Sequence, residues 1–261
     1  MNPYLISEPA VISFSGGRSS AFLLYRILEA HKFKLPETVE VVFANTGKEM
    51  PQTLDFVQAV ADNWGVVITW LEYTGKKKFI EVDFATASRD GQPFAQLIDD
   101  KNYLPNMMAR FCTSELKVLT IQRYMGGSDF LTVVGIRADE PRRAAKMRTK
   151  DNYAVPLADD GVTEIEIRKF WEAQSFDLKM PPAGINTLSN CDLCFLKGYK
   201  IKQSIVEHDP SLANWWAKQE KKINARFRSD QPSYQKMQAI ASDQGQLFDF
   251  DDESIACFCG D

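Results

Sequence analysis

The sequence predicts an α/β fold in which a parallel, twisted sheet is covered by helices on both faces. Short apolar runs typical of buried strands alternate along the chain with segments whose apolar residues recur at helical spacing. Parallel strands require crossover connections, and an alternation of strands and helices is typical of such sheets. The first element is the apolar run at 10–15, which ends in the segment SGGRSS. A helix with Ala21, Leu24 and Leu28 on one face follows directly.

The next elements continue this alternation in chain order. The run VEVVFAN at 39–45 predicts a second buried strand, residues 53–64 an amphipathic helix, and VVITWLEY at 66–73 a third strand. Between 74 and 108 the pattern weakens, and we expect a short helix within a mobile loop beside the active site. The later predictions are a helix at 115–125, strands at 130–136 and 153–157, and a helix at 164–174.

The character of the sequence changes near residue 176. A proline turn at Pro181 and Pro182 precedes paired cysteines, and helical patterns follow at 196–207 and 212–227. We therefore predict an α/β domain at residues 1–175. A smaller, mainly helical region that carries cysteines is predicted at residues 176–261.

The net charge of −4 provides no global field for a polyanion. Contact with nucleic acid would need a local basic patch, and each candidate is more simply a solvated face. The candidates are Lys76–Lys78, Arg142–Arg148, and the cluster of Lys218, Lys221 and Lys222. No stretch approaches the ~20 apolar residues of a membrane span, and no leader pattern begins the chain. We expect a cytoplasmic protein without a membrane partner.

The segment SGGRSS joins a buried strand directly to a helix. Two glycines would let backbone amides approach a phosphate closely, and Ser15, Ser19 and Ser20 offer hydroxyl donors at the positive end of the helix. The segment matches neither GxxxxGK[ST] nor GxGxxG. Walker-type kinase chemistry and Rossmann dinucleotide binding are therefore disfavoured.

Polar residues follow the predicted strands at the edge where open α/β sheets bind ligands. Asn45 and Thr46 could bind a nucleotide or hold the loop after the second strand. Five cations could neutralise phosphate or sulfate: Arg110, Lys117, Arg137, Arg142 and Arg143. Asp139 and Glu140 could pair with these arginines or bind Mg²⁺.

Five cysteines fall in three segments. Cys191 and Cys194 have the C-x-x-C spacing that lets two thiolates bind one metal centre, and Cys257 and Cys259 form a tighter pair. Cys112 lies among cations in RFCTSELK, where positive charge would lower a thiol pKa. Four thiolates suit either Zn²⁺ or a [4Fe-4S] cluster, and spacing does not separate the two.

Taken together, these motifs resemble the PAPS-reductase-like branch of the PP-loop (adenine nucleotide alpha hydrolase-like) superfamily. SGGRSS resembles the family loop SGGxDS, with Ser19 where the ATP pyrophosphatases carry aspartate. ANTGKE, RFCTSELK and VVGIRADEPRR resemble its later motifs in the same order, across roughly residues 10–157.

The resemblance implies an enzyme that binds an adenine nucleotide, ATP or PAPS. Its reaction would be reduction of PAPS or adenylylsulfate with a thioredoxin-like reductant, or ATP-dependent transfer of sulfur from a sulfur donor. The residues assigned to the nucleotide are Ser13, Ser15, Gly16, Gly17, Arg18, Ser19, Ser20, Asn45, Thr46, Gly47, Glu49, Arg110, Lys117, Gly135, Arg137, Arg142 and Arg143.

The resemblance also implies a [4Fe-4S] cluster beside the nucleotide. Its ligands would be Cys112, Cys191 and Cys194, with Cys257 or Cys259 as the fourth. The residues assigned to catalysis are Arg137, Asp139 and Cys259. Cys259 is included because a terminal cysteine is the nucleophile of the reductases. The alternative is a nucleotide-sensing or partner-binding protein without turnover, in which the cysteines hold structural zinc.

Overall fold

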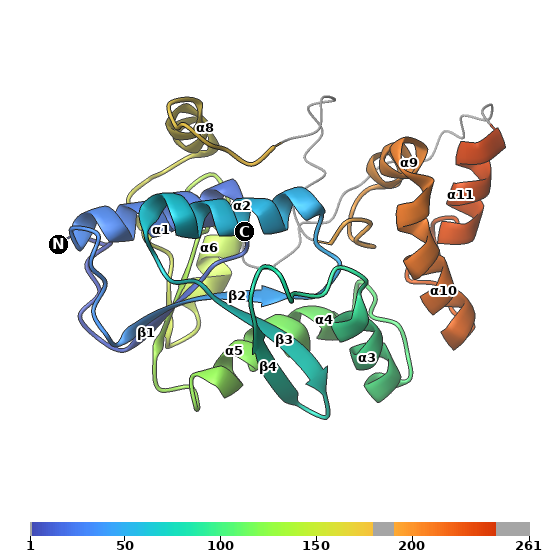
Figure 1. The fold of residues 1–261 in the computed structure, drawn as a ribbon, viewed down its shortest axis with the longest axis horizontal. Coiled ribbons are helices and arrows are strands. Elements are labelled where there is room, and N and C mark those ends of the chain that lie inside the picture. The colour runs from blue at the N-terminus through green and yellow to red at the C-terminus, as the bar shows by residue number, and fades with distance from the viewer. Residues whose placement is uncertain (1, 180–190, 244–261) are drawn as a thin grey trace.

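A six-stranded sheet forms the centre of the computed structural model, which describes residues 2–179 and 191–243 (Figure 1). The strand order is β4-β3-β2-β1-β5-β6, and every neighbouring pair is parallel except β3 and β4. The strands are β1 (Ala10–Ser13), β2 (Val39–Asn45), β3 (Thr69–Gly75), β4 (Lys78–Val82), β5 (Leu131–Val134) and β6 (Tyr153–Ala154). The predicted α/β class with a mainly parallel sheet is confirmed.

The central strands are apolar on both faces because helices cover both. In β2, Val41 and Phe43 belong to one buried cluster, whereas Val42 and Ala44 belong to another on the opposite face. This alternation is the two-residue period of a strand. The first cluster packs under α1 (Arg18–Ala30) and α2 (Pro51–Trp64), and α8 (Glu164–Glu172) lies against α1.

The opposite face is covered by one interrupted helix that runs from 111 to 124. It consists of α4 (Phe111–Thr113), a π-helical segment η1 (Ser114–Val118) and α5 (Leu119–Tyr124), which contributes Ile121 to the second cluster. Figure 1 shows α5 and α4 below the sheet and α1 and α2 above it. A π-helical turn inside a helix is frequently found at functional sites.

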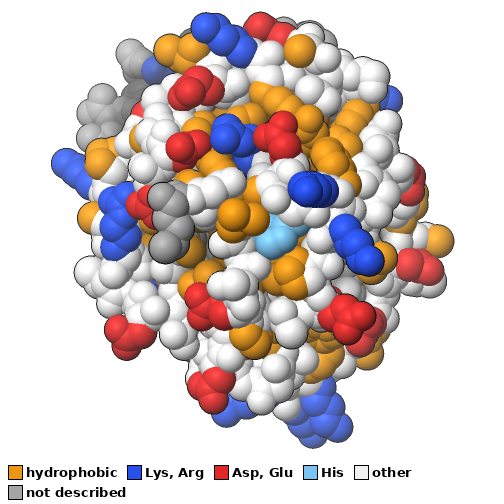
Figure 2. Space-filling view, turned by 90° about the vertical axis from the view of Figure 1, so that its left-hand side faces the viewer, with side chains coloured by type: hydrophobic (Ala, Val, Ile, Leu, Met, Phe, Trp, Pro, Cys, Tyr) orange, Lys and Arg blue, Asp and Glu red, His pale blue; other side chains and the backbone are white. Residues whose placement is uncertain are grey.

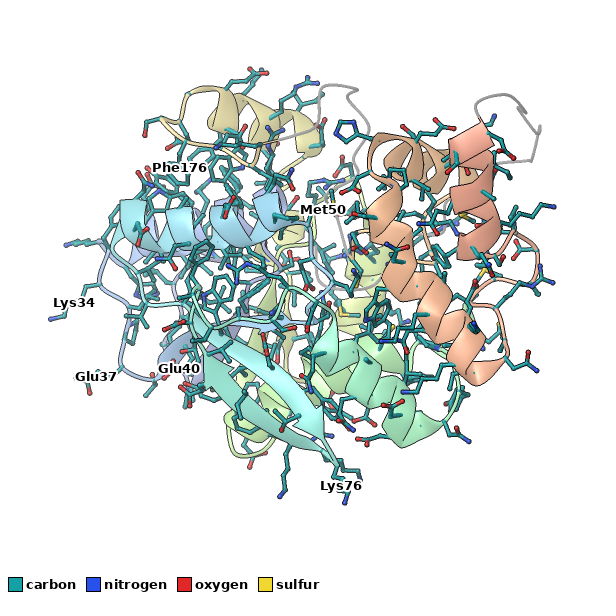
Figure 3. The ribbon with its side chains drawn as sticks, turned by 45° about the vertical axis from the view of Figure 1, so that its right-hand side comes forward. Lys34, Glu37, Glu40, Met50, Lys76 and Phe176 are labelled. Atoms are coloured by element: carbon teal, nitrogen blue, oxygen red, sulfur yellow. The ribbon has the colours of Figure 1, made fainter. Side chains whose placement is uncertain are left out.

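The region from 74 to 108 contains more regular structure than the sequence predicted. Its helix is α3 (Gln92–Lys101), as expected, but β4 forms a hairpin with β3 that was not predicted. Lys76 and Lys77, at the hairpin tip, have φ of 46° and 63°, which suits a tight hairpin turn (Figure 3). An edge strand is largely exposed, so it lacks the apolar run by which the other strands were predicted.

The predicted strand at 153–157 is shorter than expected. Only β6 pairs with β5, and Pro156 then begins the short helix α7 (Pro156–Asp159). Proline has no N–H to give to a strand, whereas the first turn of a helix does not need one. The connection between β5 and β6 holds α6 (Pro141–Arg148).

The C-terminal helices pack against the central part of the chain. They are α9 (Tyr199–His208), the 3-10 turn η2 (Pro210–Leu212), α10 (Ala213–Ile223) and α11 (Tyr234–Asp243), of which α11 was not predicted. Trp216 and Phe227 share a buried cluster with Phe94 of α3 and Phe111 of α4. The helical C-terminal region is thus seen, while the boundary at residue 175 stays a prediction.

The charge on one face of the molecule is mixed. On the face shown in Figure 2, basic and acidic side chains are interspersed, so this face presents no extended patch of one sign. Among the helices of residues 2–179 and 191–243, none combines the length and the apolar content that a bilayer crossing requires.

Candidate nucleotide and thiol site

The glycine loop lies between β1 and the N-terminus of α1. Gly16 has φ of +80°, and a Cβ there would lie 2.7 Å from the side-chain methyl of Thr53 in α2. Gly135, just after β5, is equally constrained, since its Cβ would lie 2.9 Å from Cα of Ser20. Both glycines therefore let the strand ends and helices close tightly around this loop.

Ser20 fixes the shape of the loop from inside. Its buried hydroxyl donates to the carbonyl of Gly17 at 2.9 Å, and accepts from the amides of Ser15 and Gly17 at 3.3 Å each. The hydroxyls of Ser15 and Ser20 lie 2.9 Å apart. Ser20 therefore orders the loop, while Ser13 and Ser15 reach the wall of an adjoining pocket.

Arg137 lies beside the N-terminus of α1. Arg137 and Ser19 of this helix were both assigned to the nucleotide site, which requires them to be close together. Nη1 of Arg137 donates to Oγ of Ser19 at 3.2 Å, and its Nε donates to Asp139 at 2.8 Å. Asp139 is thus occupied with the arginine, one of the two roles expected for it. Arg18 pairs with Asp177, with Nε–Oδ1 at 2.8 Å, so its side chain points toward the segment after α8.

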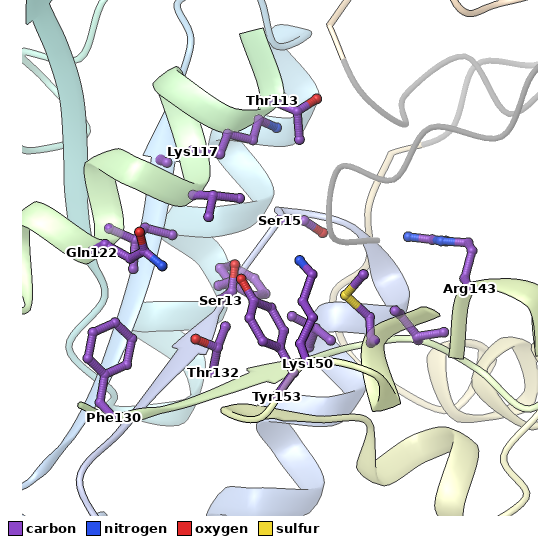
Figure 4. Close-up of a pocket in the computed structure, with 17 residues that line it drawn as sticks. Ser13, Ser15, Thr113, Lys117, Gln122, Phe130, Thr132, Arg143, Lys150 and Tyr153 are labelled. Atoms are coloured by element: carbon purple, nitrogen blue, oxygen red, sulfur yellow. The ribbon is translucent and has the colours of Figure 1, made fainter. Parts of the chain in front are cut away.

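Two pockets adjoin each other among the described residues, and the larger one opens beside the glycine loop. It encloses about 840 Å³ of empty space, its open mouth included. Figure 4 shows Arg143 at one end, Gln122 and Phe130 at the other, and Ser13 and Ser15 between them. The walls are Ser13, Phe14, Ser15, Ala44, Thr113, Lys117, Val118, Ile121, Gln122, Phe130, Thr132, Val134, Ile136, Arg143, Met147, Lys150 and Tyr153. An elongated, mostly apolar cavity with cations and hydroxyls is suited to a nucleotide.

Arg143 is the buried cation of this pocket. It pairs with Glu140, yet its Nε and Nη2 have no hydrogen-bond partner among the described residues, although both atoms are buried. Buried polar groups are normally hydrogen-bonded, so these donors are available to an anionic ligand. Arg110, just before α4, and Arg142, exposed on α6, line neither this pocket nor the thiol pocket described below.

Several residues of the larger pocket were missed by sequence reasoning. Lys150 and Tyr153 lie together, with Nζ of Lys150 4.3 Å from the ring centroid. Burial lowers the pKa of Lys150, and neighbouring Lys146 lowers it further. Thr113, Gln122, Thr132 and Met147 also line this pocket and were not assigned to it from the sequence. Apart from Thr113 in RFCTSELK, no motif marks these positions, because they meet only when α5, α6 and β6 come together around β5.

The turn after β2 is held by internal hydrogen bonds. The fully buried amide of Asn45 donates to Glu72 at 2.6 Å and to the carbonyl of Ser88 at 2.9 Å, and its oxygen accepts from the amide of Gly47 at 3.1 Å. Burial raises the pKa of Glu72. Of the two roles expected for Asn45, these contacts support holding the loop.

Replacing Asn45 with alanine should therefore lower the free energy of unfolding by about 2–3 kcal/mol, since buried groups lose their partners. Urea unfolding measures this change. Asn63→Ala is the matched control, because the Asn63 amide donates to the carbonyl of Ala59 at an exposed position. Equal stability of the two variants would contradict the structural role of Asn45.

A second, smaller pocket brings three cysteines together. Cys112, Cys191 and Cys194 all line it, with Thr46, Phe94, Thr113, Leu116, Lys117, Phe195, Leu196 and Trp216. Burial raises the pKa of Cys191, and the negative charge of Glu49 raises it further. Within residues 2–179 and 191–243, no three Cys, His, Asp or Glu side chains form a compact group around one ion. Cys257 and Cys259 lie outside the described residues.

The C-x-x-C segment is docked directly onto the turn after β2. The backbone of Cys191 forms an isolated antiparallel β-bridge with that of Glu49, and Sγ of Cys191 lies 3.5 Å from Oγ1 of Thr46. Buried Lys48 and Asp192 form an ion pair at 2.7 Å, and the indole of Trp216 donates to Asp192 at 2.8 Å. Residues far apart in the sequence therefore build one site.

Thr113 and Lys117 line both pockets. Thr113 is the last residue of α4 and Lys117 lies within η1, with its Nζ 3.7 Å from Oε1 of Glu49. The π-helical segment thus forms the wall between the larger pocket and the thiols. A ligand in the larger pocket would meet the same lysine that borders the cysteines.

This chain belongs to the phosphoadenosine phosphosulfate (PAPS) reductase domain family, whose model matches residues 9–154. Among curated proteins it is similar to the uncharacterized nin region protein ORF290 of Escherichia phage lambda, with 33% identity over 201 residues, 72% of this chain and 66% of that protein. An uncharacterized protein of Methanocaldococcus jannaschii is 28% identical over 151 residues, 56% of this chain. This chain spans 66% and 27% of the lengths of these relatives.

A solved structure also matches the chain weakly. The U34-tRNA thiolase NcsA from Methanococcus maripaludis with its [4Fe-4S] cluster aligns with 82% of this chain and 72% of that chain, at 14% identity and a TM-score of 0.35.

Proposed function

We propose that this protein is an enzyme that binds an adenine nucleotide in the larger pocket and performs sulfur chemistry at its boundary with the cysteines. The observation that carries the proposal is the wall shared by the two pockets, formed by Thr113 and Lys117. Family membership supports the adenine nucleotide and the sulfur chemistry. The reaction is reduction of PAPS or adenylylsulfate, or ATP-dependent sulfur transfer.

The phosphate or sulfate groups would bind at the N-terminus of α1. Ser15 of the glycine loop lines the pocket near this helix end, and Arg143 of α6 offers a buried guanidinium with two donors that have no partner among the described residues. Arg137 lies beside them through Ser19. The apolar end of the pocket near Phe130 would take the adenine ring.

The donor chemistry of the cysteines and their shared pocket support a thiolate-ligated cluster. Cys112, Cys191 and Cys194 would hold it, with Cys257 or Cys259 as fourth ligand. Thiolates are the usual ligands of [4Fe-4S] clusters, which supply electron transfer or a binding place for sulfur. Lys117 would stabilise negative charge on the group transferred between the pockets, and the apolar walls would limit access of water.

Nucleotide titration of anaerobically purified protein tests the proposal. Calorimetry with ATP, with PAPS and with adenylylsulfate should show saturable binding of at least one of the three. Sulfite formed with a thioredoxin-like reductant would assign a reductase, whereas pyrophosphate or AMP formed with a sulfur donor would assign a transferase. Failure of all three nucleotides to bind would contradict the proposed function. Binding without any product would favour the nucleotide-sensing alternative.

Adjacent arginines provide a matched test of the phosphate site. Arg143→Gln should weaken nucleotide binding about tenfold to hundredfold, because hydrogen bonds to charged groups contribute about 1.5–3 kcal/mol each. Arg142→Gln should bind like the wild type, since Arg142 is exposed and does not line the pocket. Equal affinities of the two variants would show that phosphate does not bind at Arg143.

A further inference from the structure

Helix α9 buries a lysine on its inward face. Lys202 is fully buried and lies at helical spacing from Tyr199 and Val206, which pack in the C-terminal core. An amphipathic helix normally places an apolar residue at such a position. Lysine here therefore departs from the pattern of the helix, and such departures concentrate at functional sites.

The ammonium of Lys202 has no hydrogen-bond partner among the described residues. Its Nζ lies 5.3 Å from the ring centroid of Tyr234, and that contact is with a π face rather than an acceptor. Burial lowers the pKa of Lys202 to about 8, with the charge of Arg228 acting in the same direction. A buried charge is costly unless an opposite charge compensates it.

The nearby carboxylates are already engaged. Asp230 pairs with Arg228, whose Nε donates to it at 2.7 Å. Glu220 accepts from the amides of Phe227 and Tyr234 at 3.2 and 2.9 Å. Negative charge on Cys194, like that on Glu220 and Asp230, would favour the charged form of Lys202.

The same geometry connects Lys202 to the C-x-x-C turn. The hydroxyl of Tyr234 donates to the carbonyl of Leu193 at 2.6 Å, between the two cysteines. A second buried cation, Lys197, donates to the carbonyls of Cys191 and Asp192 at 2.7 and 2.8 Å. The turn therefore lies in a buried environment with several cations, which suits an anionic group.

We propose that Lys202 is the counter-ion of the group held by Cys191 and Cys194, and that its ammonium favours uptake of an electron by that group. The inference rests on the proposed function, because it assumes a thiolate-ligated cluster at these cysteines. Lys202 would act as a positioning residue. Its charge would act on the cluster through space, and it does not line the nucleotide pocket.

The test compares Lys202→Met with Lys200→Met. Lys200 lies two positions earlier in α9 and is exposed, so it controls for loss of a lysine from the same helix. Each protein is reconstituted anaerobically with iron and sulfide, and its midpoint potential is measured by titration with dithionite. Lys202→Met should have a lower potential, with reduction disfavoured about tenfold, which is ~59 mV for one electron. Lys200→Met should match the wild type.

Stability separates this role from a structural one. Metal-free Lys202→Met should melt at or above the wild-type temperature, because replacing an uncompensated buried charge by an apolar side chain is often neutral or stabilising. A metal-free variant that melts below the wild type would mark Lys202 as structural and overturn the inference. Lys202→Gln gives a second neutral variant if Lys202→Met does not fold, and Lys202→Arg should restore the wild-type potential.

The outcomes also separate this inference from the proposed function. A loaded wild type whose potential equals that of Lys202→Met would overturn the inference alone. A wild-type protein that assembles no cluster would overturn the proposed cofactor and this inference together, while leaving nucleotide binding as a separate result.

Discussion

Replacing either Cys191 or Cys194 with serine is expected to remove the cluster, so that iron falls from about four per chain to well under one. A serine hydroxyl remains protonated at neutral pH and is a poor substitute for a thiolate. Both cysteines line the thiol pocket, and the turn that carries them is fixed by the buried Lys48–Asp192 ion pair. The measurement is iron, sulfide and zinc content of anaerobically purified protein.

Nucleotide affinity provides the internal control for these variants. Neither cysteine lines the larger pocket, so ATP or PAPS binding should persist when the metal is lost. Cys257→Ser and Cys259→Ser extend the experiment, because only the variant that removes the fourth ligand should lose the cluster. Unchanged metal content in both Cys191→Ser and Cys194→Ser would exclude them as essential ligands. Zinc in place of iron would favour the alternative in which four cysteines hold a structural zinc ion.

The sequence predicted those parts of the fold that are marked by short, contiguous patterns of residues. The strand at 39–45 is mostly apolar and buried because helices cover both its faces, and the glycine loop is recognisable because it joins such a strand to a helix. The hairpin strand β4 was missed because its exposed edge position removes that apolar signal. The strand at 153–157 was overextended because Pro156 suits the start of a helix.

Only part of the candidate site could be predicted, because some of its residues acquire their surroundings only when distant segments pack together. Motifs identified Arg143, Lys117 and the C-x-x-C segment, since each has a chemical signature of its own. Lys150 and Lys202 carry no such signature, because surface lysines are common and only strand order and helix packing reveal their surroundings. The neighbourhood of Cys112 and Cys191 likewise depends on contact between distant parts of the chain.

Replacing Lys117 with methionine should lower turnover about 10²- to 10³-fold while ligand binding changes less. The reason is its position, because Lys117 lines both pockets and would meet negative charge that develops between nucleotide and thiols. Loss of one well-placed charge or hydrogen-bond donor typically reduces the catalytic rate by about this factor. The measurement is kcat and KM for sulfite or pyrophosphate formation, whichever product the protein makes.

A second substitution distinguishes catalysis from stability at this position. Lys117 is 3.7 Å from the buried carboxylate of Glu49, so Lys117→Met also leaves that acid without its cation. Adding Glu49→Gln should recover thermal stability but not turnover. Lys101→Met is the matched control, since Lys101 pairs with Glu115 at 2.9 Å and lines neither pocket. Recovery of turnover in the double variant would mean that Lys117 acts only by neutralising Glu49.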